Sequence, residues 1–366
     1  MSTIFHPPSL SAPIEIEWEI TYLCSLECAH CYTSSGKRVR RNELNSVEAL
    51  NLIDRLADLR VFRIIIGGGE PLVRNDIFDI IRHCNERKVF AAINSNGTLI
   101  TQDVARQLKK LEVTKIQISL LGLQETHDNI TGVGGSFDAA VLGIKNLVAE
   151  EIKVAISTPL FAQLIPSQIH PMANLLEELR IFEWKFMQFF PVGRGSNKRT
   201  WRPSLKQLRE FYKLIETIKH EKNFKVTCYF PPGLPITRNI ERLAGHPSLK
   251  YAGCCCGERQ LLIKADGSIH PCAFLRTPQF KCGNIRSVDL ADVWANSPIL
   301  SRIREARLNI TGKCRDCHYF KVCRGGCRSF AYVFTGDLYA SDPTCHYVPS
   351  EAEDIYSFYL ELGEDE

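Results

Sequence analysis

The sequence has no long hydrophobic run and little net charge. No stretch approaches the roughly 18 uninterrupted apolar residues that a membrane-spanning helix requires. The N-terminus, MSTIFHPPSLSAP, lacks the charged start and the apolar core of a signal peptide. A formal charge of +4 is small for 366 residues and does not indicate a nucleic-acid partner. We therefore expect a cytoplasmic protein that binds neither a membrane nor a nucleic acid.

The length and the distribution of residue types predict two domains. A chain of 366 residues exceeds the roughly 250 to 300 at which one hydrophobic core usually stops growing. From about residue 14 to 230, short β-rich runs alternate with amphipathic helical runs, which is typical of a parallel sheet covered by helices. Eleven of the fifteen cysteines follow residue 227, among glycines, prolines and short turns. We therefore expect a tail at 1–13, an α/β domain at 14–230 and a cysteine-rich domain at 231–366.

Six strand and helix units are predicted in the α/β domain. The expected strands are 14–21, 62–67, 89–95, 115–120, 153–159 and 183–189. Helical stretches such as 46–59 separate them, and a helix at 204–221 and a strand at 224–229 close the region. Six units fall short of the eight that close a barrel. We therefore expect an open, partial (β/α)6 barrel of the TIM type, with its chemistry at the carboxyl ends of the strands.

Three cysteines stand close together after the first predicted strand and have no fourth partner nearby. Cytosolic thiols are kept reduced, so metal binding explains fifteen cysteines better than disulfides do. Cys24, Cys28 and Cys31 have the spacing C-x3-C-x2-C. A structural zinc or an electron-transfer 4Fe-4S cluster takes four protein ligands, whereas three thiolates leave one position open. The alternative is a zinc site that borrows a distant ligand.

A glycine-rich motif follows the second predicted strand. GGGEP comprises Gly67, Gly68, Gly69, Glu70 and Pro71. Glycines let backbone carbonyls approach a ligand closely, and carbonyl oxygens together with a carboxylate suit an ammonium donor. No Lys-Ser or Lys-Thr follows, which excludes the phosphate-binding Walker loop.

These motifs resemble those of the radical S-adenosylmethionine (SAM) superfamily, in which an aromatic residue follows the three cysteines, here Tyr32. The resemblance implies a 4Fe-4S cluster whose open iron binds the amino and carboxylate groups of SAM, and whose electron splits SAM to a 5'-deoxyadenosyl radical. It also assigns SAM contacts on GGGEP, NSNG, ISLLG and PVGRG. These contacts are Tyr32, Gly67, Gly68, Gly69, Glu70, Asn94, Ser95, Asn96, Ser119 and Arg194.

Two positions depart from the pattern of that family. Relatives commonly have an aspartate where this chain has Leu121, and an arginine where it has Thr131. If those charged groups bind the SAM carboxylate or position the substrate in relatives, another residue must do so here. Because of these departures, the substrate and mechanism of relatives transfer less directly to this chain. The radical chemistry is still expected.

The C-terminal cysteines resemble the SPASM extension of that superfamily in order and spacing. The resemblance implies two auxiliary 4Fe-4S clusters, and hence three clusters in all. One would be held by Cys314, Cys317, Cys323 and Cys345, and the other by Cys256, Cys272 and Cys327 with a fourth ligand. Cys254 is the expected fourth ligand, with Cys255 and Cys282 as alternatives. Zinc ribbons remain the competing interpretation of the C-x2-C pair.

Most SPASM proteins modify peptides, so we expect a radical SAM enzyme that acts on a ribosomally made precursor peptide. The stretches 34–38, 67–71, 323–327 and 334–336 most resemble mycofactocin maturases, which act on a C-terminal Val-Tyr; spliceases, which excise tyramine, are related. The expected reaction is an excision, a decarboxylation or a crosslink. Only 23 residues precede Cys24, so a separate small leader-recognition protein is expected, together with a flavodoxin- or ferredoxin-type reductant.

Other functions stay open from the sequence. Within enzymes, the alternatives are a formylglycine-generating maturase and a maturase of a porphyrin-type small molecule. The alternatives outside enzymes are an iron-sulfur electron carrier and a zinc-bound scaffold. His83, His127, Asp128 and Tyr229 are available as acids or bases, and none of them is assigned that role.

Overall fold

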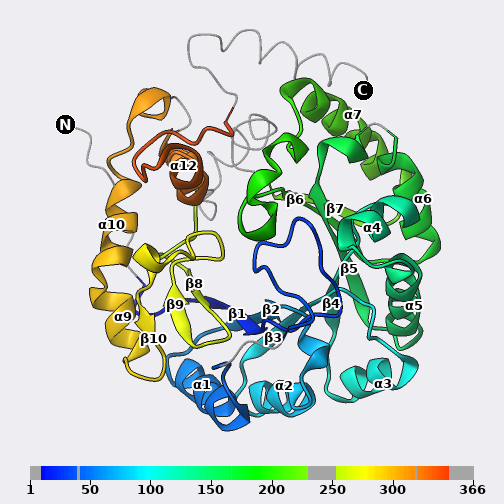
Figure 1. The fold of residues 1–366 in the computed structure, drawn as a ribbon, viewed down its shortest axis with the longest axis horizontal. Helices are drawn as coiled ribbons and strands as arrows, with labels where there is room; N and C mark the ends of the chain where they lie inside the picture. The colour runs from blue at the N-terminus through cyan, green and yellow to red at the C-terminus, as the bar shows by residue number, and fades with distance from the viewer. Residues whose placement is uncertain (1–9, 39–41, 166, 230–252, 318–319, 346–366) are drawn as a thin grey trace.

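One ten-stranded sheet organises the chain. The structure is a computed structural model that describes residues 10–38, 42–165, 167–229, 253–317 and 320–345. The strand order is β10-β9-β8-β1-β2-β3-β4-β5-β6-β7. Neighbours from β8 to β7 are parallel, and β9 is antiparallel to both β8 and β10. The sheet curves into an open barrel with helices on its outside (Figure 1).

The α/β domain contains the strands expected from the sequence, each end within one residue of its predicted place. They are β1 (Glu15–Thr21), β2 (Arg63–Gly68), β3 (Phe90–Ser95), β4 (Lys115–Ser119), β5 (Lys153–Leu160), β6 (Glu183–Gln188) and β7 (Lys225–Tyr229). The partial barrel is therefore confirmed. The predicted domain boundary near residue 230 lies outside the described residues.

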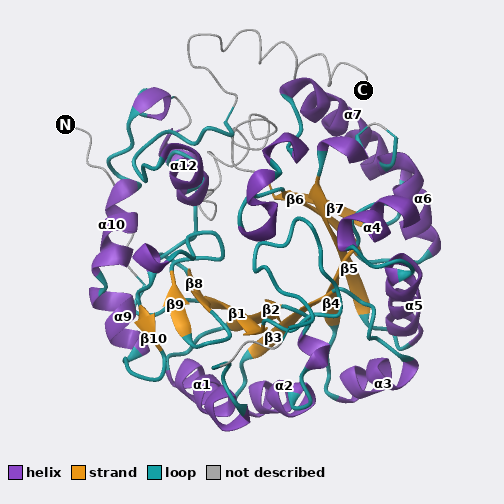
Figure 2. Cartoon of the chain, in the orientation of Figure 1, coloured by secondary structure: helices purple, strands orange, loops and turns teal. Residues whose placement is uncertain are grey.

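Six of the first seven helices cover the outer face of the sheet, and α4 lies inward of α5 and α6, where its last residues hydrogen-bond with the cysteine loop (Figure 2). The seven helices are α1 (Ser46–Asp58), α2 (Ile77–Glu86), α3 (Gln102–Lys110), α4 (Gln124–Thr131), α5 (Ser136–Ala149), α6 (Ile169–Glu178) and α7 (Leu205–Glu221). Capping boxes begin α1 at Asn45 and α7 at Ser204, where the cap side chain and the third helical residue satisfy each other's backbone N–H groups. Among the described residues, no helix combines the length and the apolar character needed to cross a bilayer.

The cysteine-rich region supplies short elements to the other end of the sheet. Its strands are β8 (Gln260–Ile263), β9 (Ser268–His270) and β10 (Gly283–Asn284), and its helices are α9 (Leu290–Asn296), α10 (Pro298–Ala306), α11 (Phe320–Cys323) and α12 (Arg328–Thr335). β8 pairs in parallel with β1 from Glu15 opposite Gln260 to Trp18 opposite Ile263. These strands were not predicted. They make the cysteine-rich region continuous with the barrel sheet.

Alternation along β1 separates an apolar outer face from a polar interior. Ile16, Trp18 and Ile20 are fully buried in the core that the sheet shares with the helices. Successive strand residues point to opposite faces, so the intervening glutamates face the interior of the barrel. Cys84 of α2 is fully buried in the same core, where it packs as a small apolar side chain.

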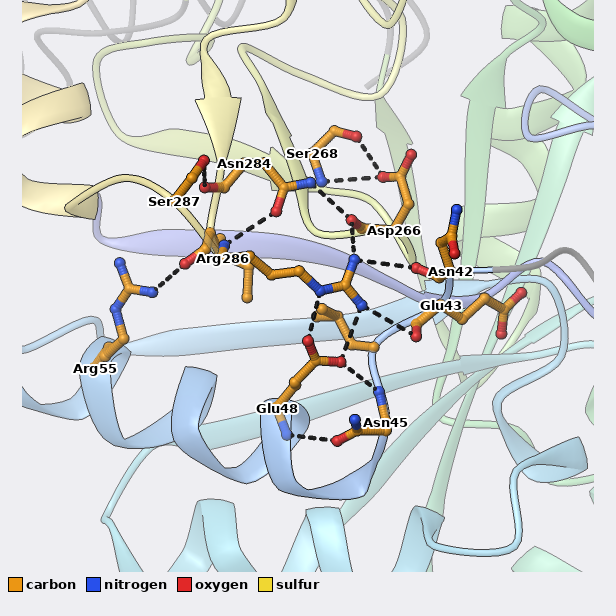
Figure 3. Close-up of polar contacts among 12 residues, drawn as sticks. Asn42, Glu43, Asn45, Glu48, Arg55, Asp266, Ser268, Asn284, Arg286 and Ser287 are labelled. Atoms are coloured by element: carbon orange, nitrogen blue, oxygen red, sulfur yellow. Dashed lines mark hydrogen bonds and ion pairs between the residues drawn. The ribbon is translucent and has the colours of Figure 1, made fainter.

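Arg286 attaches the cysteine-rich region to α1 (Figure 3). Its guanidinium donates to both carboxylate oxygens of Glu48 and to the backbone carbonyls of Asn42, Glu43 and Asp266. The hydrogen bond from Arg286 is the main reason that the pKa of Glu48 falls to about 2. One arginine therefore ties three chain segments together.

Arg286→Ala is expected to lower the free energy of unfolding by about 1–2 kcal/mol. The pair with Glu48 is partly exposed, so its ionic part is discounted, and the lost carbonyl bonds add to it. Urea unfolding measures the change. Arg82→Ala is the matched control, because its pair with Asp79 is more exposed and makes no bridge between regions. Equal losses in the two variants would contradict a docking role for Arg286.

Candidate functional site

The first cysteine group lies on a loop that leaves β1 at its carboxyl end and crosses the mouth of the barrel (Figure 1). The Cys24 N–H donates to the Gly36 carbonyl at 2.9 Å, and the Cys31 N–H donates to the Cys28 carbonyl at 3.1 Å. Burial, and then the nearby Cys31 and Cys24 thiols, raise the pKa of Cys28 to about 12. The three thiols therefore lie close to one another in a partly buried loop.

The loop after β2 packs directly against the cysteine loop. The Gly69 N–H donates to the Thr21 carbonyl at 2.7 Å, and the Glu70 N–H donates to the Leu23 carbonyl at 2.9 Å. A Cβ atom on Gly69 would lie 2.1 Å from the Leu23 carbonyl oxygen, and Gly68 has a φ of 103°. A larger residue at either position would push the loops apart. Backbone packing thus requires these glycines, in addition to any approach to a ligand.

Glu70 joins the glycine motif to the third strand. Its buried carboxylate accepts the Ser95 hydroxyl at 2.8 Å and the Asn96 N–H at 2.7 Å, and burial raises its pKa to about 7. The Asn96 amide donates to the Cys24 sulfur at 3.7 Å and to the Ser25 hydroxyl at 3.0 Å. The structure therefore brings Glu70, Ser95 and Asn96 together with the first cysteine group.

Arg194, on the 3-10 turn η3 (Gly193–Asn197), holds the cysteine loop from the other side. Its Nε donates to the Cys28 carbonyl at 2.9 Å, and its backbone N–H donates to the Cys31 carbonyl at 3.0 Å. One terminal nitrogen of Arg194, Nη2, is buried without a partner among the described residues. Arg194 thus stabilises the loop and keeps one donor for a further acceptor.

The remaining predicted contacts lie along the carboxyl edge of the sheet. Gly67, Asn94 and Ser119 stand at the ends of β2, β3 and β4. Asn94 is next to Gly67, where an added Cβ atom would lie 3.7 Å from the Asn94 Cβ. Ser119 pairs in register with Ser157 of β5. All three share the edge that carries the cysteine loop.

Tyr32 points into the interior of the barrel, where it meets an ion pair that sequence reasoning missed. Its hydroxyl donates to the Glu17 carboxylate at 3.3 Å, its ring lies edge-on to Phe274 at 5.9 Å, and Arg276 lies over it at 5.5 Å. Arg276 also donates through both terminal nitrogens to the fully buried Glu19, at 2.7 and 2.9 Å. An arginine of the cysteine-rich region therefore neutralises a carboxylate inside the barrel.

The signal for this interior cluster was present in the sequence. The first predicted strand, IEIEWEIT, carries Glu15, Glu17 and Glu19 at alternate positions. Glutamate is almost never fully buried unless it is paired. Three glutamates on one face of an interior strand therefore indicate that positively charged or hydrogen-bond-donating side chains lie opposite them.

Glu17→Gln is expected to stabilise the protein at pH 8. Burial, and then the nearby Glu19, raise the pKa of Glu17 from 4.5 to about 7. The folded-state pKa is the higher one, so the stability that protonation provides is complete below about pH 4.5 and is lost as the pH rises through about 7. Glutamine stays neutral, and we expect a gain of about 1–3 kcal/mol at pH 8 and a much smaller one at pH 5. Urea unfolding at both pH values measures this, and equal gains would contradict it.

The two positions that depart from the family pattern carry no charge in the folded site. The Leu121 N–H donates to His127 Nδ1 at 3.1 Å, and the Thr131 hydroxyl shares a hydrogen bond with the Ser136 hydroxyl at 2.7 Å. His127 Nε2 is buried without a partner among the described residues. Burial lowers the pKa of His127 to about 4, so this side chain is neutral at physiological pH.

Two of the other candidate acids and bases have structural roles. Asp128 accepts backbone N–H groups at the start of α5, and hydrogen bonds there contribute to its lowered pKa although its burial acts the other way. His83 lies on α2 and pairs with Asp54 of α1 at 2.8 Å, on the outside of the barrel. The side chain of Tyr229 lies outside the described residues. None of them is placed as a catalytic acid or base.

The second cysteine group joins four thiols from three segments. The Cys254 thiol hydrogen-bonds with those of Cys256 and Cys327, and Cys256 also hydrogen-bonds with Cys272. The Cys272 sulfur lies 3.1 Å from the Ser329 hydroxyl. The four thiols predicted for one auxiliary cluster are therefore neighbours.

The other cysteines near this group turn elsewhere. Cys255 donates its thiol to Gln260 Oε1 at 2.9 Å, on the start of β8. Alternate residues of an extended chain point in opposite directions, which explains why Cys254 and Cys256 contact each other while Cys255 points to another partner. Cys282 donates to the Phe280 carbonyl at 3.6 Å. Of the three candidates for a fourth ligand, Cys254 is the one whose thiol hydrogen-bonds within the group, whereas the Cys254 and Cys272 thiols act on Cys255 only through their charge.

The third cysteine group, which comprises Cys314, Cys317, Cys323 and Cys345, lies beside the second. Burial, followed by the nearby Cys345 and Cys314 thiols, raises the pKa of Cys323, and Cys317 follows Cys314 on the same turn with its N–H 3.4 Å from the Cys314 carbonyl. The buried Asp342 lies between the two groups. Its carboxylate accepts the backbone N–H of Cys327 at 2.7 Å, and its charge also acts on Cys323.

The donor sets fit iron-sulfur chemistry. Thiolate is the ligand by which proteins hold Fe-S clusters. Among the residues that the structure describes, no three His, Cys, Asp or Glu side chains close around a single metal-ion position. A 4Fe-4S cluster instead takes one thiolate at each ligated iron. The three thiols of the first group and the four of the second match those requirements, and in the third group the thiols of Cys314, Cys323 and Cys345 lie near one another with Cys317 on the same turn as Cys314.

The comparisons with known proteins agree with this arrangement. The radical SAM superfamily matches residues 18–176, and the SPASM iron-sulfur cluster-binding domain matches residues 254–318. An AdoMet-dependent heme synthase of Methanosarcina barkeri is 31% identical over 93% of this chain and 98% of its own length. A mycofactocin maturase of Mycolicibacterium smegmatis is 32% identical over 92% of this chain and 83% of its own length.

Solved structures share the fold. SuiB of Streptococcus suis, bound to its precursor peptide SuiA, matches 93% of this chain and 77% of its own with a TM-score of 0.76 and 24% identity. The protein anSMEcpe with bound AdoMet matches 95% of each chain with a TM-score of 0.74 and 17% identity. At these identities the likeness concerns the fold alone. The sequence relatives carry the assignment: this chain belongs to the radical SAM superfamily and has a SPASM domain.

Proposed function

We propose that this protein is a radical SAM enzyme that removes a hydrogen atom from a precursor peptide and thereby modifies it. The observation that carries the proposal is the meeting of Cys24, Cys28 and Cys31 with Glu70 and Asn96 at the carboxyl edge of the barrel. When bound there, the cluster and SAM supply the radical that takes the substrate hydrogen. The protein positions them, because such cofactors carry the difficult chemistry themselves.

The residues around the first cysteine group would hold SAM by its charged end. Glu70 presents a carboxylate for the SAM ammonium group, and its bonds to Ser95 and Asn96 keep that carboxylate in one orientation. Arg194 keeps a buried donor for an acceptor such as a carboxylate. Its place beside the loop makes it our candidate for the function that the family arginine, replaced here by Thr131, has in relatives.

We assign two auxiliary 4Fe-4S clusters to the SPASM region. One is held by Cys254, Cys256, Cys272 and Cys327, and the other by Cys314, Cys317, Cys323 and Cys345. Four thiolates close the coordination of a cluster, which suits electron transfer and leaves no open iron for a substrate. The buried Asp342, which lies between the two cysteine groups and accepts the Cys327 N–H, holds them at a fixed distance from each other.

The relatives support two substrate classes. Similarity to mycofactocin maturase, and a fold shared with a protein solved with its precursor peptide, favour a peptide. Similarity to heme synthases, at nearly the same identity, favours a tetrapyrrole as the second candidate. A separate leader-recognition protein, a flavodoxin- or ferredoxin-type reductant and a cytoplasmic location stay predictions from the sequence.

Anaerobic reconstitution followed by mass spectrometry tests the proposal. The enzyme is given SAM, dithionite and either a synthetic peptide ending in Val-Tyr or iron coproporphyrin III. We expect 5'-deoxyadenosine with either mixture and a change of mass in the peptide: loss of a carboxyl group and hydrogen for decarboxylation, of two hydrogens for a crosslink, or of a tyramine unit for excision. A change of mass in the porphyrin and none in the peptide would show that the substrate is a tetrapyrrole and not a peptide. Failure to cleave SAM with all clusters in place would contradict the enzymatic function.

A further inference from the structure

The segment that joins β6 to α7 is strongly basic and lies at the carboxyl end of the barrel. Residues 189–204 contain Arg194, Lys198, Arg199 and Arg202 and no aspartate or glutamate. None of the four forms an ion pair with a described residue. Figure 1 shows this segment on the side of the barrel mouth that faces α12. A positive charge that forms no ion pair with a described residue therefore stands at the carboxyl end of the barrel, and the buried Asp342 acts on it only at Arg202.

Two of these arginines share one aromatic support on α12. The Arg202 guanidinium lies 5.7 Å from the centre of the Phe330 ring and 4.7 Å from that of Phe334, and Arg199 lies 5.2 Å from Phe334. Arg199 is exposed and Arg202 is half-buried. The Nε atom of Arg202 is buried and has no hydrogen-bond partner among the described residues. Stacking orients a guanidinium but leaves its in-plane donors unused.

The aromatic support connects the arginines to both ends of the site. Phe330 lies against Phe190 at 3.8 Å between ring centres, Phe190 stacks on Phe274 at 3.9 Å, and Phe274 meets Tyr32 beside the first cysteine group. The residue before Phe330, Ser329, contacts Cys272 of the second group. Phe190 and Phe330 are buried within this row of rings, whereas Phe274 and Phe334 keep some exposed surface. A molecule held between the two cysteine groups would therefore meet Phe274 and Phe334, with the arginines at its edge.

We propose that Arg199 and Arg202 bind a carboxylate of the substrate and so set which end of it faces the radical. This inference rests on the proposed function and deepens it. The planar fork of arginine matches a carboxylate with two parallel hydrogen bonds. Both substrate classes offer that group, as the C-terminal carboxylate of a peptide or as a propionate of a tetrapyrrole. The shared chemistry is a carboxylate attached to an apolar or aromatic body that packs against the exposed part of Phe334.

Equilibrium binding without turnover tests this proposal. The reconstituted full chain is titrated with a fluorescent peptide ending in Val-Tyr as the free acid, with the same peptide as the C-terminal amide, and with iron coproporphyrin III. We expect Arg199→Gln and Arg202→Gln each to weaken binding of a carboxylate probe by about tenfold or more, as loss of a charged hydrogen bond does. The amide should bind as weakly to the native protein as the acid does to the variants. Lys206→Gln, which removes one charge from the exposed start of α7, is the matched control and should change nothing.

The results separate the two sources and the two proposals. Loss of peptide affinity in the arginine variants assigns the C-terminal carboxylate, and loss of porphyrin affinity assigns a propionate. Equal binding of acid and amide, together with unchanged porphyrin binding in both variants, would overturn the proposal. So would native protein that binds none of the probes. SAM cleavage without substrate is measured in parallel on the native protein and on Lys206→Gln, which should be equal, and its absence from the native protein would contradict the enzymatic function instead.

Discussion

Cys28→Ala is expected to abolish SAM cleavage, with a decrease of at least about a thousandfold in 5'-deoxyadenosine formation, because a cluster bound by three thiolates does not survive the loss of one. Arg194 donates to the backbone carbonyl of Cys28, and burial raises the pKa of the Cys28 thiol to about 12. Quantification of 5'-deoxyadenosine after anaerobic reconstitution with dithionite measures the effect. Iron analysis of the same sample should show about one third less iron than the native chain, if three clusters are present.

Cys84→Ala is the matched control for this variant. It removes the same thiol from a fully buried position on α2, among apolar side chains and away from the three cysteine groups. We expect it to keep all the iron and the SAM cleavage of the native protein, at some cost in stability because it leaves a small cavity. SAM cleavage by the Cys28 variant, or iron loss from the Cys84 variant, would show that the first cluster is held elsewhere.

Cys254→Ser and Cys255→Ser are expected to differ sharply although the residues are adjacent. The Cys254 thiol hydrogen-bonds with two other cysteines of the second group, whereas Cys255 bonds with Gln260 on β8. Loss of Cys254 should therefore remove or convert one auxiliary cluster, with about one third of the iron lost and product formation reduced at least tenfold. Loss of Cys255 should leave the iron unchanged. Iron analysis and electron paramagnetic resonance of the reduced proteins measure both effects.

SAM cleavage separates this effect from damage to the first cluster. The Cys254 variant should still release 5'-deoxyadenosine, because the first cysteine group is on another loop. Cys282→Ser gives a second control, since that thiol bonds with a backbone carbonyl outside the group. Iron loss in the Cys255 variant that equals the loss in the Cys254 variant would reverse the assignment. Iron loss in the Cys282 variant would add that residue to the ligands.

The strands and the first cysteine group could be predicted because their signals are local. Short β-rich runs alternate with amphipathic helices, and this pattern locates each strand of the barrel to within one residue. Cys24, Cys28 and Cys31 stand within eight residues, so their spacing alone brings the thiols together. The shared carboxyl edge of a parallel sheet then accounts for the approach of Glu70 and Asn96.

The attachment of the cysteine-rich region could not be predicted because it depends on distant contacts. β8 is four residues long and pairs with β1 some 245 positions earlier in the chain, with Glu15 opposite Gln260. A run that short carries no distinctive period. The ion pair between Arg276 and Glu19 joins the same two regions, and neither residue belongs to a motif. Glu19 needs Arg276 as its partner only because the contact between the cysteine-rich region and the barrel buries both side chains.

The sequence by itself determined which thiols form the first group, which family the chain resembles and where its barrel strands run, since spacing and periodicity act over a few residues. The folded structure decided which member of the Cys254–Cys256 triplet turns away, that Tyr32 faces the interior, and that Arg199 and Arg202 share the ring of Phe334. Each of these depends on side-chain direction at a contact between segments far apart in the chain. Such directions follow from packing, which no local pattern contains.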